Sequence, residues 1–189
     1  MRRIGIFGGT FDPPHIGHLI IAEEVRFALD LEQIWFIPTN IPPHKQNASS
    51  TSLQRLAMLE IAIKSNDNFR INPIEIEKNN VSYTIETITT LQKIHPDTTF
   101  YFIIGADMVE YLPNWKQVDV LVEMVKFVGV KRANFTLSTP YPIIELNTPL
   151  IDISSTEIKK RIKNQEPIMY FLPNGVFTYI KEHQLYDWE

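Results

Sequence analysis

Hydrophobic and polar residues alternate along this chain in blocks that predict strands and helices in turn. Short apolar runs with the length of buried strands are followed by segments whose apolar residues recur at helical spacing. This order is typical of a parallel sheet covered by helices on both faces. The predicted strands are Arg3–Phe7, Ile34–Ile37, Phe69–Ile76, Phe100–Ile104 and Lys126–Val130. The predicted helices are Ile16–Leu29, Leu53–Lys64, Ile85–Ile94 and Val118–Met124.

The C-terminal part of the chain adds one more strand and two more helices to this pattern. The strand is either Ile143–Leu146 or Leu150–Ile153. One helix begins at Ser154, and the last helix covers Val176–His183. The polar, proline-bearing stretch 38–52 predicts a long loop of the kind that often closes over substrate in α/β enzymes. We therefore expect a single domain over residues 1–189, with a doubly wound, Rossmann-like α/β fold. Ligands in such sheets bind at the carboxyl ends of the strands, where the strand order reverses.

Composition narrows the class of protein. The chain has 189 residues, of which 44% are hydrophobic and 21% are charged, as in an ordinary globular domain. It has no apolar run of membrane-spanning length and too few apolar residues at its start for a signal peptide, so we expect a cytoplasmic protein with no membrane partner. A net charge of -4 does not favour nucleic acid as a partner. The absence of cysteine excludes thiol nucleophiles. The sequence is compatible with a homo-oligomer.

The most informative segment is the block from Gly8 to His18, which reads Gly-Gly-Thr-Phe-Asp-Pro-Pro-His-Ile-Gly-His directly after an apolar run. The glycine pair lets the backbone turn close to an anion, and the two prolines favour a helix start. His15 and His18 then share one face of the first helical turn, where free N–H groups and the helix dipole attract phosphate. A lone histidine at a helix start is usually only packed there. The combination with the glycines and prolines favours a phosphate site.

A second segment with the same chemistry begins at Ser154. Ser154 and Glu157 have the spacing of a helix capping box, and capping alone explains these two residues. It does not explain the further hydroxyls of Ser155 and Thr156, or the cations that follow in the next turn. Hydroxyls, amides and cations at a helix start suit the β- and γ-phosphates of a triphosphate. The cations are Lys159, Lys160 and Arg161.

These segments together carry a resemblance to a known family. The tetrad His15–His18 is the signature of class I aminoacyl-tRNA synthetases, and the wider block resembles the nucleotidyltransferase branch of that superfamily. The length of the chain and the lack of a Lys-Met-Ser-Lys-Ser loop favour the second group. With the segment 153–161, the chain resembles the nicotinate mononucleotide adenylyltransferases. Further matches to family positions occur, in order, at 41–45, 82–87, 102–107 and Trp115.

The resemblance implies an activity. Such an enzyme joins ATP and nicotinate mononucleotide to give nicotinate adenine dinucleotide and pyrophosphate, a step in making NAD, with Mg²⁺ bound mainly through the substrate phosphates and no metal held by the protein. The attacking phosphate monoester has a second pKa of about 6 and needs no general base. Two alternatives are another small adenylyl- or cytidylyltransferase, such as the pantetheine-phosphate kind, and a nucleotide sensor without turnover. The segments at 42–45 and 83–87 disfavour the first, and the intact histidines with Arg161 disfavour the second.

The resemblance also implies roles for single residues. His15 and His18 are catalytic and donate hydrogen bonds near the α- and β-phosphates. Gly105 packs against the adenosine, and Asp107 contacts its ribose. The residues implied in ATP binding are Gly8, Gly9, Thr10, Phe11, Gly105, Asp107, Ser155, Thr156 and Arg161. The residues implied in nicotinate mononucleotide binding are His44, Lys45, Thr84 and Trp115.

Several of these roles have plain structural alternatives. Trp115 is either a core residue or the stacking platform for the pyridine ring, and Thr84 either caps a helix or offers its N–H to the nicotinate carboxylate. His44 and Lys45 either reach substrate phosphate or are merely solvated. Lys159 stands where the family commonly has arginine, so it offers a point charge instead of a bidentate contact, and Arg161 is the favoured phosphate ligand. The roles of Lys131 and Arg132 stay open.

Overall fold

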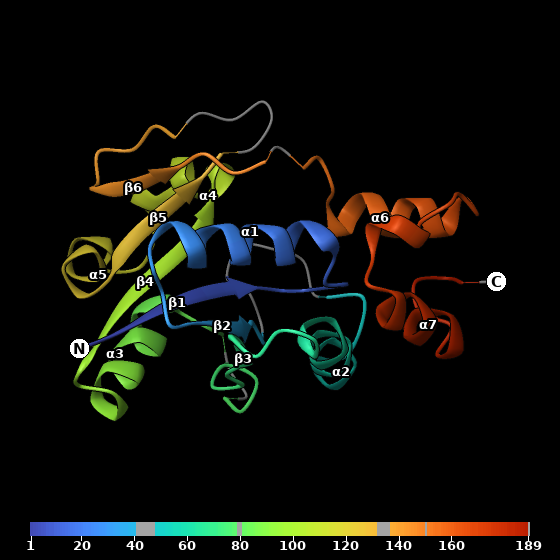
Figure 1. Ribbon diagram of the computed structural model, residues 1–189, viewed down its shortest axis with the longest axis horizontal. Helices are drawn as coiled ribbons and strands as arrows, with labels where there is room; N and C mark the ends of the chain where they lie inside the picture. The colour runs from blue at the N-terminus through green and yellow to red at the C-terminus, as the bar shows by residue number, and fades with distance from the viewer. Residues whose placement is uncertain (41–47, 79–80, 132–136, 150, 189) are drawn as a thin grey trace.

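The computed structural model describes residues 1–40, 48–78, 81–131, 137–149 and 151–188, and these residues form a six-stranded sheet flanked by helices (Figure 1). The strand order is β3-β2-β1-β4-β5-β6, and every neighbouring pair is parallel. This order confirms the predicted doubly wound, Rossmann-like fold. The strands are β1 (Arg2–Gly9), β2 (Gln33–Pro38), β3 (Phe69–Ile71), β4 (Thr98–Gly105), β5 (Lys126–Val130) and β6 (Ile143–Leu146).

The helices follow the predicted pattern closely where the apolar period is long. The long helices are α1 (Ile16–Ala28), α2 (Ser52–Ile63), α3 (Thr84–Ile94), α5 (Val118–Met124), α6 (Ser155–Lys163) and α7 (Asn174–Glu182). Three further elements were not predicted, because they are too short to show a period. They are α4 (Ala106–Tyr111) and the 3₁₀ turns η1 (Leu112–Asn114) and η2 (Met169–Phe171).

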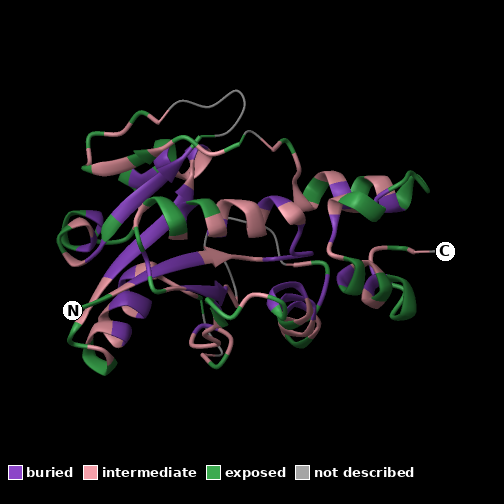
Figure 2. Cartoon of the chain, in the orientation of Figure 1, coloured by how far each residue is buried: buried purple, intermediate pink, exposed green. Residues whose placement is uncertain are grey.

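The alternation of side chains along the strands builds a separate core on each face of the sheet. In β1, Ile4 and Ile6 point to one core and Phe7 to the other, and all three are buried. The first core packs against α3, α4 and α5, whereas the second packs against α1, α2, α6 and α7. Figure 2 shows the same layering, with buried strands and helices whose outer faces are exposed.

Two strand predictions need revision. The third strand ends at Ile71 and does not extend to Ile76, because the chain turns there: the side chain of Asn72 accepts a hydrogen bond from the N–H of Ile74, 3.2 Å away, and the intervening Pro73 has no N–H for a sheet ladder. Of the two alternatives for the last strand, Ile143–Leu146 is correct, and residues 151–153 are not in a strand.

The glycine pair does not form the predicted turn. Gly8 and Gly9 are the last residues of β1 and pair with Ile37 and Pro38 of β2. The chain changes direction after them, at Phe11, whose φ is 51°. Glycine is nevertheless needed at position 9, because a Cβ there would lie 3.0 Å from the ring of Phe11. Gly9 therefore permits a close approach of the Phe11 ring to the strand end instead of a backbone turn.

This topology brings several helix ends to one edge of the sheet. The order reverses between β1 and β4, which lie side by side and end at Gly9 and Gly105. Figure 1 shows α6 and α7 beyond the carboxyl end of β1, together with the C-terminus, while the N-terminus lies at the opposite end. Helix α7 packs on α2, where Gly175 permits the contact: a Cβ there would lie 2.5 Å from Ile61.

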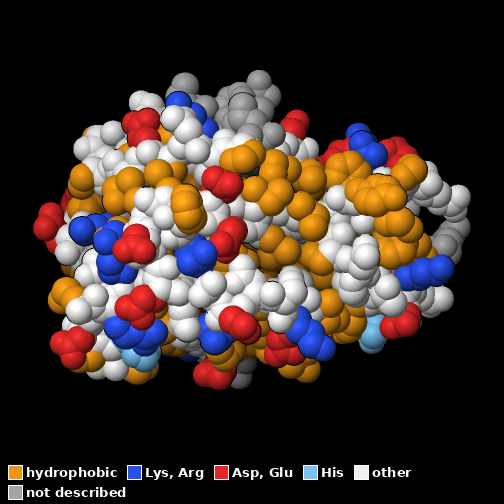
Figure 3. Space-filling view, viewed as in Figure 1, with side chains coloured by type: hydrophobic (Ala, Val, Ile, Leu, Met, Phe, Trp, Pro, Cys, Tyr) orange, Lys and Arg blue, Asp and Glu red, His pale blue; other side chains and the backbone are white. Residues whose placement is uncertain are grey.

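The surface bears on the expected partners. On the face shown in Figure 3, Lys and Arg side chains are interspersed with Asp and Glu, so this face offers no basic field for nucleic acid. Within the part of the chain that the structure describes, no helix is both long enough and apolar enough to cross a membrane.

Candidate active site

Two adjoining cavities lie at the carboxyl ends of β1 and β4. The larger cavity has a volume of ≈ 620 Å³ and the smaller cavity ≈ 190 Å³. Both are lined by the end of β1 and by Gly105, so the two spaces lie side by side and share part of their walls. The residues that line both are Phe7, Gly8, Gly9, Thr10, Ile103, Gly105 and Met108.

The larger cavity contains the histidine pair. His15 is the N-cap residue of α1, and His18 is the third residue of the helix, so both lie at its N-terminus. Their rings stack with centroids 3.7 Å apart and planes inclined by 25°. The backbone N–H of His15 donates a hydrogen bond to Nδ1 of His18 over 3.1 Å. Nδ1 of His18 is therefore the unprotonated nitrogen, and Nε2 carries the hydrogen that this side chain can donate.

The glycine between the histidines has a steric role. A Cβ at Gly17 would lie 3.1 Å from Nδ1 and 3.2 Å from Cε1 of His15, closer than ordinary van der Waals contact. His15 is 4% exposed, and its ring is stacked on His18, so a shift of the His15 ring would act on the His18 ring as well. Gly17 thus sets the position of the imidazole pair.

The start of α6 forms the opposite wall of the larger cavity. The side chain of Ser154 accepts a hydrogen bond from the N–H of Glu157 over 3.1 Å, which confirms the predicted N-cap. The Ser155 hydroxyl donates to the carbonyl oxygen of Pro13 over 2.9 Å and so fastens α6 to the histidine block. Thr156 is exposed and lines the cavity. Two helix N-termini, those of α1 and α6, therefore face one space, which favours anions.

The cation that α6 directs into this cavity is Lys159, together with Lys131 from the end of β5. Arg161 lies elsewhere: its Nε is 3.0 Å from Glu157 Oε1, and its guanidinium lies 4.8 Å from the ring centroid of Phe171. Residues two apart in a helix point about 200° from each other, so both side chains cannot face one cavity. The structure thus brings Lys159, and not the favoured Arg161, to the larger cavity. A contact of Arg161 with ATP stays a prediction.

Gly105 and Asp107 occupy the turn from β4 into α4. Gly105 is the N-cap residue of α4, and a Cβ there would lie 2.8 Å from Oδ1 of Asp107. Glycine therefore lets the Asp107 carboxylate fold back over the strand end, beside the larger cavity that it lines. This position is compatible with the predicted contact to a ribose.

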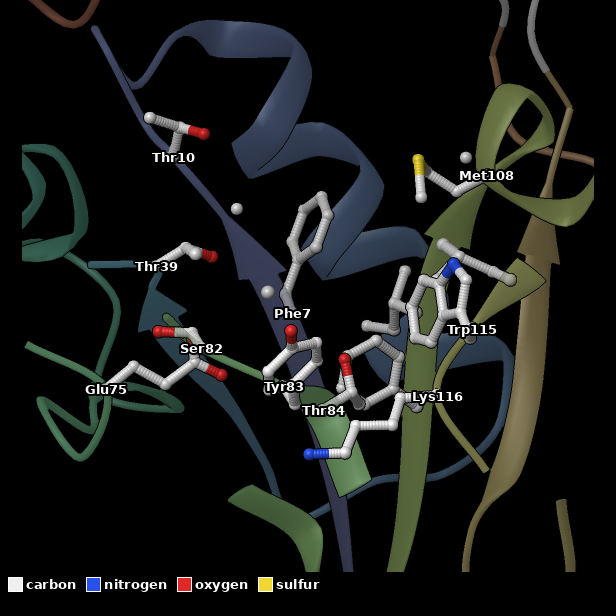
Figure 4. A pocket seen from close by; sticks show the side chains of 16 residues that line it. Phe7, Thr10, Thr39, Glu75, Ser82, Tyr83, Thr84, Met108, Trp115 and Lys116 are labelled. Carbon is white, nitrogen blue, oxygen red and sulfur yellow. The ribbon is translucent and has the colours of Figure 1, made fainter. Parts of the chain in front are cut away.

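The smaller cavity has an aromatic wall (Figure 4). Trp115 packs edge-to-face against Phe102 and Phe127, with ring centroids 5.8 Å and 5.9 Å away. Its Nε1 is buried and has no hydrogen-bond partner within the described part of the chain. Thr84 is the first residue of α3 and lines this cavity, so the N-terminus of the helix lies beside it. Buried polar groups without partners inside a cavity indicate a polar ligand.

The sequence did not point to two residues of the smaller cavity, Lys116 and Glu75. Lys116 lies 4.0 Å from the ring centroid of Tyr83, and its Nζ is 2.8 Å from Glu86 Oε1. Its position next to Trp115 in the sequence was the signal that could have found it. Glu75 is buried, and Thr87 Oγ1 donates to its carboxylate over 2.8 Å. Burial raises the pKa of Glu75 above its ordinary value, which no sequence pattern indicates.

The predicted residues therefore separate into groups. Most of the proposed ATP ligands and both histidines meet in the larger cavity, while two proposed acceptor ligands, Thr84 and Trp115, meet in the smaller one. His44, Lys45 and Arg132 lie outside the described residues. Those in the larger cavity are Gly8, Gly9, Thr10, Phe11, His15, His18, Gly105, Asp107, Ser155 and Thr156.

The comparison with protein families is unambiguous. A family model described as cytidylyltransferase-like matches residues 6–161. A Bacillus licheniformis protein called probable nicotinate-nucleotide adenylyltransferase is 52% identical over 188 residues, which cover 99% of this chain and 100% of that protein. The nicotinate-nucleotide adenylyltransferase of Bacillus subtilis is 47% identical over 188 residues, with the same coverage of 99% and 100%.

Solved structures confirm the fold. The Plasmodium falciparum nicotinic acid mononucleotide adenylyltransferase complexed with NaAD superposes with a TM-score of 0.87 at 22% identity, covering 100% of this chain and 99% of that chain. The same enzyme complexed with APC gives a TM-score of 0.83 at 23% identity, covering 100% of this chain and 99% of that chain. Because the bacterial relatives match along almost the entire chain at 47% to 52% identity, this chain belongs to the nicotinate-nucleotide adenylyltransferase family.

Proposed function

We propose that this protein transfers the adenylyl group of ATP to nicotinate mononucleotide, which gives nicotinate adenine dinucleotide and pyrophosphate in the synthesis of NAD. One observation carries the proposal: two cavities of different chemistry share one wall at the carboxyl ends of β1 and β4. The larger has histidines, helix N-termini and lysines, as a triphosphate requires. The smaller has an indole face and a helix N-terminus, as an aromatic acid requires. Because the reaction consumes ATP, we place it in the cytoplasm.

The reaction is an in-line displacement at phosphorus. An oxygen of the acceptor's 5′-phosphate forms a bond to the α-phosphorus of ATP, and the bond from that phosphorus to the bridging oxygen breaks. The electron pair leaves with pyrophosphate, so atoms and charges balance. The acceptor phosphate is already largely dianionic at neutral pH, because its second pKa is about 6. The protein's task is to hold two anions together and to offset the charge on the transferred and leaving groups.

Particular groups of this chain suit that task. The Nε2–H of His18 is a neutral donor for a phosphate oxygen, since Nδ1 already accepts from the His15 backbone. His15 stacks on His18 and gives the pair one orientation. Lys159 and Lys131 supply positive charge on the side toward the leaving pyrophosphate. The N–H groups of the first turn of α6 add hydrogen-bond donors that the fold already holds in place, so they need not rearrange during the reaction.

Magnesium fits this site as a companion of the triphosphate. Within the described ranges, no group of three or more His, Asp or Glu residues is arranged to hold a metal ion. The larger cavity offers ammonium, imidazole and amide N–H groups, which bind phosphate oxygens, and two carboxylates, those of Asp12 and Asp107. We therefore assign Mg²⁺ mainly to the substrate phosphates, whose negative charge it would offset when bound.

The choice of acceptor follows from the smaller cavity. A carboxylate only accepts hydrogen bonds, so it suits the free N–H groups at the start of α3, near Thr84. A carboxamide would turn its NH₂ group toward those donors. Trp115 offers its ring as a stacking surface and is held by Phe102 and Phe127.

The test is a panel of acceptor phosphates with ATP and Mg²⁺, with release of pyrophosphate as the readout. Nicotinate mononucleotide, nicotinamide mononucleotide and 4′-phosphopantetheine are compared with a reaction that lacks acceptor. We expect rapid release with the first alone. Equal or faster release with phosphopantetheine would replace the proposed acceptor, and binding of ATP without release for any acceptor would indicate a nucleotide sensor.

A further inference from the structure

The C-terminal segment reaches into the histidine block through one side chain. Tyr186 follows α7, and its hydroxyl donates a hydrogen bond to Oδ1 of Asp12 over 2.7 Å. These two residues are 174 positions apart in the sequence. The backbone of Tyr186 has a φ of 63°, an uncommon conformation for a large side chain, so the surrounding structure holds the residue in place. A tyrosine held in this way at the edge of a catalytic block calls for a reason.

Asp12 is the centre of a small network. It is 3% exposed, and its carboxylate accepts hydrogen bonds from the hydroxyls of Tyr186 and Ser50 and, over 2.7 Å, from the N–H of Ser49. Lys159 completes the set with Nζ 3.3 Å from Oδ2. Burial acts to raise the pKa of Asp12, but the hydrogen bonds from Ser50, Tyr186 and Ser49 outweigh it and hold the pKa below its ordinary value. Asp12 is therefore an anion at neutral pH.

Lys159 connects this network to the larger cavity. Its side chain is 30% exposed and lines the cavity, while its Nζ lies 3.1 Å from Ser49 Oγ and 3.3 Å from Asp12. An ammonium has three hydrogens, so Lys159 can bind Asp12 and Ser49 and still donate to a phosphate. How strongly Asp12 attracts this ammonium depends on the other donors that share its negative charge. Each neutral donor to Asp12 therefore leaves more of the Lys159 charge for a ligand.

We propose that Tyr186 is a positioning residue of the nucleotide phosphate site. Its hydroxyl binds one oxygen of Asp12, so the Lys159 ammonium is shared between Asp12 and a polyphosphate instead of being held by Asp12 alone. The same network fastens the segment at Ser49 and Ser50 to the histidine block. Burial and the charge of Asp12 raise the pKa of Tyr186, so the hydroxyl stays a neutral donor through the physiological range. The identity of the polyphosphate as ATP rests on the proposed function.

The first test is Tyr186→Phe, which removes only the hydroxyl. We expect the KM for ATP, and the Kd of a non-hydrolysable ATP analogue measured by calorimetry, to rise about five- to tenfold, as for the weakening of one charge-assisted hydrogen bond. The KM for nicotinate mononucleotide should not change. Tyr170→Phe is the matched control, because Tyr170 is 89% exposed, and it should behave as the unaltered protein. Equal losses for both substrates, or none for ATP, would overturn the proposal.

The second test asks whether the effect passes through Lys159. In a Lys159→Met background, Tyr186→Phe should cause no further loss of ATP affinity, whereas in a Lys160→Met background it should cause its full loss, because Lys160 is exposed and absent from the cavity lining. A full effect in the Lys159→Met background would mean that Tyr186 is only structural. If Tyr186→Phe does not fold, Ser50→Ala removes a different donor to Asp12, and the same pattern is expected.

The binding measurement separates this inference from the proposed function. If the unaltered protein binds the ATP analogue but transfers adenylate to no acceptor, the proposed function fails, and the inference is decided by calorimetry alone. If the unaltered protein transfers adenylate to nicotinate mononucleotide and Tyr186→Phe binds the analogue normally, the function stands and the inference fails.

Discussion

Replacing Gly17 by alanine tests how accurately the fold must place the histidine pair. The added methyl group would lie 3.1 Å from Nδ1 and 3.2 Å from Cε1 of His15, so the ring has to move by a few tenths of an ångström. It cannot move freely, because His15 is 4% exposed and its ring stacks on His18 at 3.7 Å. We therefore expect the displacement to pass to His18 through the stacked rings and through the hydrogen bond from the His15 N–H.

The expected size follows from two opposing effects. A misplacement of about 1 Å costs about a hundredfold in rate, so a shift of a few tenths of an ångström should lower the single-turnover rate about tenfold. Alanine in place of glycine in a helix stabilises by about 1 kcal/mol, and the close contact with His15 offsets part of this. The melting temperature should accordingly change little while the rate falls.

The assay is single-turnover pyrophosphate release with saturating ATP and acceptor, together with thermal unfolding. Glu24→Ala, at an exposed position of the same helix, is the control and should leave both quantities unchanged. A Gly17→Ala variant that keeps the full rate would refute the steric role of Gly17. A variant with a strongly lowered melting temperature would show that the glycine is required for folding instead.

Three further predictions concern the remaining side chains of the two cavities. His18→Ala should lower the single-turnover rate by about two to three orders of magnitude and leave the melting temperature almost unchanged, as for the loss of one transition-state donor; a nearly full rate would remove His18 from the mechanism. The kcat/KM for nicotinate mononucleotide should be at least about a hundredfold higher than that for nicotinamide mononucleotide. Trp115→Ala should weaken the binding of both acceptors but not that of ATP. If steady-state kinetics showed this variant to be defective mainly toward ATP, the pyridine pocket would be placed wrongly. Burial raises the pKa of Glu75 above its ordinary value of 4.5, so the folded state holds the carboxyl proton more tightly than the unfolded state does. The free energy of unfolding therefore falls as the pH rises from 4.5 toward the pKa of Glu75 in the folded state. Glu75→Gln keeps the acceptor for Thr87 but cannot ionise, so its melting temperature relative to the unaltered protein should increase between pH 4 and 7, and a constant difference would contradict this reasoning.

Long periodic patterns predicted the elements well. The helix over Val118–Met124 was predicted with its observed bounds, and its buried residues Val118 and Leu121 lie three positions apart on one side of the helix. The short helix α4 and the end of β3 were not predicted correctly. In those segments one or two local contacts, such as the side-chain acceptor of Asn72, decide the conformation, and no period extends far enough to indicate it.

The candidate site divides in the same way. The position of His15, His18 and Ser155 at two helix starts could be predicted from local sequence, because a glycine, a proline or a hydroxyl at a helix start acts on its immediate neighbours. Their roles toward ATP stay predictions, and the Ser155 hydroxyl donates to the carbonyl oxygen of Pro13. The choice between Lys159 and Arg161 could not, since both carry one positive charge on the same helix. It depends on which side of α6 faces the cavity, and that is set by the burial of Ile158 and Ile162 in the core.

The sequence by itself determined the fold class, the family resemblance and the two helix starts with histidines or hydroxyls, because each is encoded by residues close together in the chain. Only the tertiary structure decided that the two cavities share a wall, that Glu75 is buried beside the smaller cavity, and that Tyr186 binds Asp12. These relations join residues that are distant in the sequence. They arise from the strand order and from the packing of α6 and α7 against it, which local patterns do not contain.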